Sequence, residues 1–187
     1  QLAKLALNAK DLPEATQHVQ ALLRSDPNDG SAHWLQGILL MQSQKCAEAT
    51  MSFRRALRGG HDPRKSGIGL GMACMGMGDI EEAWRVFEQV VVDHPDDTEA
   101  MNWLIQSGTS LQRWNGLSQQ LSRYVERNPA DCDMRFALAG VEFRAGRMAL
   151  AKEQFELLSL LKPDYEGLKD LGILLQPAPV EMHALTT

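Results

Sequence analysis

The sequence predicts an all-α protein, an α-solenoid of antiparallel helix pairs. Three regularities predict this fold: proline recurs every 34 residues, a small residue recurs twelve positions before it, and a bulky apolar residue recurs eight positions before it. A period of this length is typical of stacked helical hairpins, which bury their apolar faces against neighbouring hairpins. The prolines of the series are Pro27, Pro95, Pro129 and Pro163, and His61 takes the remaining place.

The recurring order of residues has a physical explanation. A small residue lets the second helix of a hairpin approach the first, a bulky residue fills the space beyond it, and proline ends the helix. Gly78-Asp79 and Gly146-Arg147 supply turn signals inside two of the hairpins. The small positions hold Ala15, Ala49, Ala83, Leu117 and Ala151, and the bulky positions hold Val19, Phe53, Phe87, Leu121 and Phe155.

In chain order, the repeats are a truncated hairpin at about 1–29 and complete hairpins at 30–63, 64–97, 98–131 and 132–165. Gly59-Gly60 is expected to stop the helix where His61 replaces proline. Ile105 and Leu117 stand where small residues are usual, so the two helices of 98–131 are expected to lie further apart.

A capping helix is expected at about 165–176, because Asp164 can cap it and apolar residues follow at helical spacing. This helix would cover the end of the stack. We therefore expect a single domain over residues 1–176, followed by a tail or linker at 177–187. The chain starts with Gln1 rather than Met, which indicates a processed chain or a fragment.

The pattern resembles the tetratricopeptide repeat family. That resemblance implies a right-handed superhelix of 34-residue helix pairs, with the first helix of each pair lining a concave groove that receives partner peptides. The matching residues are Gly37, Leu40, Ala49, Phe53 and Ala56 in one hairpin, Leu70, Gly71, Gly78, Ala83, Phe87 and Pro95 in the next, and Leu138, Ala139, Gly146, Ala151, Phe155 and Pro163 in the last.

Composition narrows the range of partners. The chain has 187 residues, with 19 Lys and Arg against 24 Asp and Glu, and this acidic balance argues against nucleic acid as a partner. The longest uncharged stretch, residues 66–78, is too short to span a membrane. Cys46, Cys74 and Cys132 are odd in number and widely spaced, which favours free thiols and, weakly, the cytoplasm, while the compartment itself stays unknown.

Motifs for catalysis and metal binding are missing from the sequence. Residues 59–66 come close to a phosphate-binding loop, but Arg64 stands where the second glycine is required. The five histidines are scattered, and neither C-x-x-C nor H-E-x-x-H occurs. We therefore expect no enzyme activity, no cofactor and no metal site.

The candidate partner-binding residues follow from helical spacing within the first helix of each hairpin. They are Trp34, Ile38, Met41, Lys65, Ile68, Met72, Met75, Asn102, Trp103, Gln106, Phe136, Phe143 and Arg144. Their apolar, Met-rich and Trp-containing character predicts a partner peptide or helix with apolar anchors. Alternatively, a neighbouring repeat or another segment of the same protein covers several of them.

Three functional hypotheses follow. The first is a non-catalytic scaffold that binds a partner segment in the groove. The second, implied by the resemblance, is the targeting or regulatory portion of a larger enzyme such as a glycosyltransferase or methyltransferase, or of a secretion component. The third is self-assembly into a homo-oligomer, in which one copy's groove holds the terminal helix or tail of another, as the apolar run 171–175 suggests.

Overall fold

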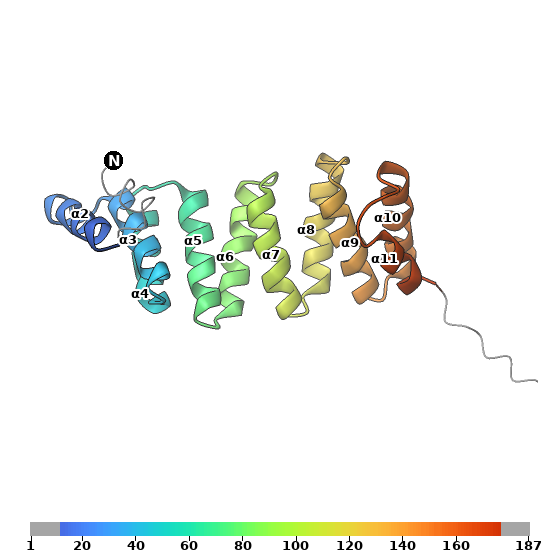
Figure 1. The fold of residues 1–187 in the computed structure, drawn as a ribbon, viewed down its shortest axis with the longest axis horizontal. Coiled ribbons are helices and arrows are strands. Elements are labelled where there is room, and N and C mark those ends of the chain that lie inside the picture. Colours follow the sequence, from blue (N-terminus) through green and yellow to red (C-terminus); the bar gives the residue numbers. More distant parts are fainter. Residues whose placement is uncertain (1–11, 177–187) are drawn as a thin grey trace, which may run out of the picture. The chain divides into compact units, whose positions relative to one another are not determined.

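The computed structural model describes residues 12–176, and this part of the chain is helical without any strand (Figure 1). The helices are α2 (Leu12–Ser25), α3 (Gly30–Gln42), α4 (Cys46–Arg58), α5 (Pro63–Gly76), α6 (Ile80–Asp93), α7 (Thr98–Ser110), α8 (Trp114–Arg127), α9 (Cys132–Arg144), α10 (Met148–Leu161) and α11 (Leu168–Leu174). Neighbouring helices pack as pairs, so the predicted all-α solenoid class is confirmed.

The described residues form two compact units, divided after residue 112. In the first unit each helix from α2 to α7 packs against the next, and α5 also contacts both α3 and α7. In the second unit α9 packs against α8 and α10, and α10 contacts α11. The single domain expected over 1–176, and the wider spacing expected between the helices of 98–131, stay predictions.

Aspartate starts the first helix of each of the four complete hairpins. Asp29, Asp62, Asp97 and Asp131 each accept a hydrogen bond from a backbone N–H in the first turn of the helix that follows. A side-chain acceptor at this position satisfies a backbone donor that has no partner inside the helix. The same residue type therefore defines the start of α3, α5, α7 and α9.

Two different devices end the second helices. His94, Asn128 and Lys162 precede prolines and have extended backbone, with φ of −130°, −121° and −148°, because the proline ring disfavours helix in the residue before it. After α4, Gly60 has a φ of +75° and its N–H bonds the carbonyl of Leu57, while the N–H of His61 bonds the carbonyl of Ala56. This Schellman motif confirms the predicted stop at Gly59-Gly60.

The turns inside the hairpins share a left-handed residue. Gln44, Gly78, Gln112 and Gly146 are spaced 34 residues apart and have φ values of 58°, 80°, 55° and 75°. Only glycine adopts this conformation without steric cost. The sequence predicted the turns at Gly78 and Gly146, whereas the two glutamine turns carry no such signal.

Phenylalanine rings packed against glycines form the core of the first unit. Phe53 is fully buried, and a Cβ atom added to Gly37 or to Gly69 would lie 2.6 Å from its ring. Phe87 packs in the same way against Gly71, but on its other side it stacks on Trp103, with ring centroids 5.9 Å apart. Trp103 lies 34 residues after Gly69, so one position of the repeat is filled by glycine once and by tryptophan once.

The last helix is shorter than the sequence predicted. α11 begins at Leu168 rather than near residue 165, and the residue before it, Gly167, has a φ of +85° and forms no side-chain cap. Asp164 is therefore not its cap. Leu171 and Leu175 of this region pack with Ala139 and Ala151 in the core of the second unit.

Candidate functional site

The predicted partner-binding residues lie on α3, α5 and α7 of the first unit and on α9 of the second. Their side chains differ widely in exposure. Ile68 is buried; Trp34, Ile38, Met41, Met72, Met75, Trp103, Phe136 and Phe143 are partly buried; and Lys65, Asn102, Gln106 and Arg144 are exposed. Apolar members are therefore mostly half-covered within the chain itself, and the polar ones face solvent.

Trp34 is held largely by its own unit. Its ring packs against the core formed by α2 and α3 and lies 5.1 Å from the His61 ring, centroid to centroid. Its indole Nε1 is buried and has no hydrogen-bond partner among residues 12–176. This arrangement gives Trp34 a packing role in addition to any role at the surface.

Trp103 also makes a defined internal contact. Its ring stacks on the buried Phe87 at an interplanar angle of 13°, which joins α7 to α6. Asn102 and Gln106, on the same helix, are exposed. The polar members of the predicted set on α7 are therefore more accessible than its tryptophan.

An ion-pair network links the N-termini of α5 and α7. Arg64 donates two hydrogen bonds to the Asp97 carboxylate, and its Nη2 lies 2.9 Å from Glu99 Oε2. Burial alone would raise the pKa of Asp97, but hydrogen bonds from Arg64 and the Ala100 amide, with the charge of Arg64, lower it below its ordinary value. The sequence identified Arg64 only as the residue that interrupts a phosphate-loop pattern, and its structural role became visible only in three dimensions.

The second unit contains an apolar cavity of about 490 Å³ between α9 and α11. Three predicted residues, Phe136, Phe143 and Arg144, line it. The opposite wall comes from the region of α11, which the sequence had predicted only as a cap. The complete lining is Phe136, Gly140, Phe143, Arg144, Gly167, Asp170, Leu171 and Leu174.

Tyr165 fixes one side of this cavity. Its ring lies 5.2 Å from that of Phe136, and its hydroxyl donates a hydrogen bond of 2.8 Å to Asp133 Oδ1. Burial, followed by the hydrogen bond to Asp133 and the charge of that carboxylate, raises the pKa of Tyr165 to about 12. Tyr165 therefore ties the segment before α11 to the start of α9.

Charged side chains accompany the apolar lining. Arg144 is exposed, and its guanidinium carbon lies 5.8 Å from the centroid of the Trp114 ring, within range of a cation–π interaction. Asp170 is exposed on the α11 side. The cavity thus presents one positive and one negative group beside an apolar floor.

Residues 12–176 contain no group of three or more His, Cys, Asp or Glu side chains arranged to hold a metal ion. Within the same range, every helix is too short or too polar to cross a membrane.

The packed hairpins place the chain among the helical repeat proteins of the α-solenoid class. Residues 1–63 match the sequence profile described as a tetratricopeptide repeat, whereas no curated protein matches the chain significantly. This match and the structural neighbours given below support the assignment of the chain to the tetratricopeptide repeat family, as the sequence pattern predicted. Proteins of this family are generally non-catalytic scaffolds, which suggests a role in protein–protein interaction.

Three solved structures illustrate the likeness. YrrB, described as a TPR protein with an unusual peptide-binding site, is 18% identical with a TM-score of 0.72, over 91% of this chain and 88% of that one. MamA (residues 41 to the end) from Desulfovibrio magneticus RS-1 is 18% identical with a TM-score of 0.68, over 88% and 93%. A tetratricopeptide repeat protein from Parabacteroides merdae is 20% identical with a TM-score of 0.72, over 92% and 70%. At these identities, the likeness concerns the fold.

Proposed function

We propose that the chain is a non-catalytic scaffold and that the cavity between α9 and α11 binds an apolar anchor of a partner peptide or amphipathic helix. The observation that carries this proposal is the lining, in which Phe136 and Phe143 face Leu171 and Leu174 across about 490 Å³. Cavities of this size that are mostly apolar with a few polar groups are typical of ligand sites.

The charges at the cavity define the anchor further. Arg144 suits an acidic residue of the partner and Asp170 a basic one, so the expected ligand carries one or two large apolar side chains flanked by charges of both signs. The description of YrrB as having a peptide-binding site supports a peptide as the class of ligand. In the first unit, we propose the partly buried Ile38, Met41, Met72 and Met75 as a further apolar contact surface.

Neighbouring exposed residues on α11 allow a matched test. Leu174 lines the proposed site, whereas Ile173 lines a different cavity, against α10, and both side chains are exposed. Peptides would be selected from a random phage-displayed library against the full chain and their affinities measured by fluorescence anisotropy. Leu174→Asp is expected to weaken binding at least tenfold, and Ile173→Asp to leave it within about twofold. Equal effects of the two substitutions would contradict the proposal.

Self-assembly is a second candidate, favoured by a separate observation. Leu160 is 80% exposed and Ile173 is 65% exposed, and Leu161 and Leu174 are also exposed, so α10 and α11 present apolar side chains to solvent. Large exposed apolar patches often mark interfaces. If this face joins two copies, light scattering should show a dimer that Ile173→Asp dissociates; a monomer at all concentrations would remove this candidate. The hypothesis of a targeting portion of a larger enzyme stays open to the full reading frame.

A further inference from the structure

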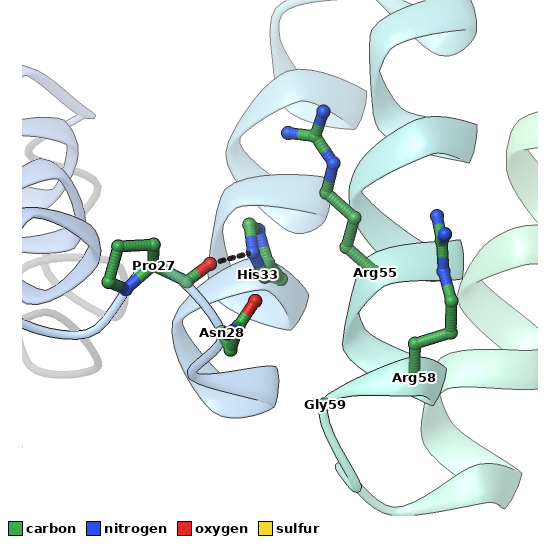
Figure 2. A pocket seen from close by; sticks show the side chains of 6 residues that line it. All are labelled: Pro27, Asn28, His33, Arg55, Arg58 and Gly59. Carbon is green, nitrogen blue, oxygen red and sulfur yellow. Dashed lines mark hydrogen bonds between the residues drawn. The ribbon is translucent and has the colours of Figure 1, made fainter.

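A second cavity, of different chemistry, lies in the first unit where the first hairpin meets the second (Figure 2). It has a volume of about 370 Å³. Pro27 and Asn28 of the loop between α2 and α3 form one side, His33 of α3 contributes its ring, and the end of α4 contributes Arg55, Arg58 and Gly59. The lining contains three basic side chains and no carboxylate.

The two arginines carry positive charge that is not neutralised nearby. Arg55 and Arg58 lie one turn apart on α4, and within residues 12–176 neither forms an ion pair with a carboxylate. Their neighbour Arg54, by contrast, lies 3.0 Å from Glu82 and is paired. Figure 2 shows the side chains of Arg55 and Arg58 extending from α4 in the same direction.

The acidic residues closest in sequence have other partners. Asp26 accepts a hydrogen bond from the amide of Asn28, and Asp29 accepts hydrogen bonds from the amides of Ser31 and Ala32 at the start of α3. These carboxylates serve the loop and the helix cap.

His33 gives the cavity a fixed wall. The residue is only 6% exposed, and its Nε2 lies 2.9 Å from the carbonyl oxygen of Pro27, to which it donates. Arg135, three repeats later, donates to the carbonyl of Pro129 at the same distance. A basic residue at this position therefore holds the loop before its helix, and the loop and ring are ordered without any ligand.

The equivalent cavity one repeat later shows that the repeat does not require this basic lining. That cavity has a volume of about 200 Å³ and lies between α5 and α6. Positions 33, 55 and 59 correspond there to Gly67, Gln89 and Asp93, so the three positions hold no cation and one carboxylate. Arg55 is replaced by glutamine at a site of the same architecture.

We propose that the cavity at Pro27, His33, Arg55 and Arg58 binds a phosphate group. A phosphate carries close to two negative charges and at least three acceptor oxygens, enough for both guanidinium groups, whereas one arginine already satisfies a carboxylate bidentately. The volume is that of a small ligand or of one phosphorylated side chain. Arginines in the last turn also complement the dipole of α4, which accounts for their stabilising the helix but not for a cavity free of carboxylates.

The test is calorimetric titration of the full chain with inorganic phosphate at constant ionic strength, beside Arg55→Gln, Arg58→Gln and a matched control, Arg123→Gln. Arg123 is exposed, lies in the second unit and occupies the same repeat position as Arg55. Saturable binding at one site is expected, weakened about tenfold by each of the first two substitutions and unchanged by the third. Arg55→Gln places at position 55 the residue that the next repeat carries, so it is expected to fold, as circular dichroism would verify.

Two further titrations separate the sources of phosphate and exclude other anions. A peptide containing phosphoserine, compared with its unphosphorylated form, distinguishes a phosphorylated segment from a free phosphate; binding of either phosphate source at this site supports the proposal. Succinate serves as the carboxylate control. Binding of succinate as tight as that of phosphate, an equal loss in Arg123→Gln, or no saturable phosphate binding would overturn the proposal.

Discussion

Aromatic side chains on the inner helices are used differently in the two units. In the first unit, Trp103 is stacked on the buried Phe87 and joins two helices. In the second, Phe136 and Phe143 line a cavity that stays open toward α11. The difference teaches that an aromatic residue at an inner position does not by itself define a binding groove, because the size of the residue that faces it decides whether the space is filled.

The largest effect on stability is expected for Trp103→Ala. Loss of a large ring stacked on a buried phenylalanine should lower the free energy of unfolding by about 3 kcal/mol. Urea denaturation followed by circular dichroism measures this change. Affinity for peptides selected against the full chain should remain unchanged, and a substantial loss of affinity without loss of stability would reverse the role assigned to Trp103.

Phe143→Ala should show the opposite balance. The ring lines the cavity and is partly buried against the core of the second unit, so we expect affinity for a selected peptide to fall by about 2 kcal/mol. The accompanying loss of unfolding free energy should be smaller than that of Trp103→Ala. Comparing anisotropy titrations with urea denaturation of both variants tests the contrast, which fails if both act only on stability.

The hairpin turns allow a reciprocal comparison of the two units. Gln44 in the first unit and Gly146 in the second occupy the same left-handed position of the repeat. Gln44→Gly should stabilise the protein by about 1 kcal/mol, because it removes the steric cost of a side chain at positive φ, and Gly146→Gln should destabilise it by a similar amount. Thermal denaturation of the two variants checks both signs; the same sign for both would contradict the explanation.

The smallest effect concerns Tyr165 at high pH. Its pKa is raised from 10 to about 12 in the folded protein, so the folded state keeps a proton that the unfolded state loses first. The stability contributed by Tyr165 is therefore fully present below pH 10 and is lost as the pH rises toward 12. Urea denaturation between pH 9 and about 11.5 should show a shallower decline in Tyr165→Phe than in the unaltered chain, and identical slopes would contradict this assignment.

The sequence predicted the hairpins well because each depends on local signals. Aspartate caps, pre-proline stops and the Gly59-Gly60 stop act within a few residues, and the structure contains all of them. The cavities depend instead on residues that meet across hairpins. The spacing rule placed Trp103 in the groove, although its counterpart Gly69 signals that this position faces a neighbouring ring.

Other features were hidden for a related reason. The shortened α11 and its wall of the cavity follow from Gly167, whose positive φ is not visible in a helical pattern. The basic cavity could have been found by comparing Arg55 with Gln89 at the 34-residue period, but its loop wall depends on the hydrogen bond from His33 to Pro27.

The Arg64–Asp97 pair has a consequence for how the first unit opens. Asp97 caps α7 through the amide of Ala100 while Arg64, at the start of α5, holds the same carboxylate. Fraying of α5 therefore releases part of the cap of α7, two helices further along. Adjacent hairpins are coupled by charge as well as by apolar contact, so amide hydrogen exchange in α5 and α7 is expected to proceed through one shared opening.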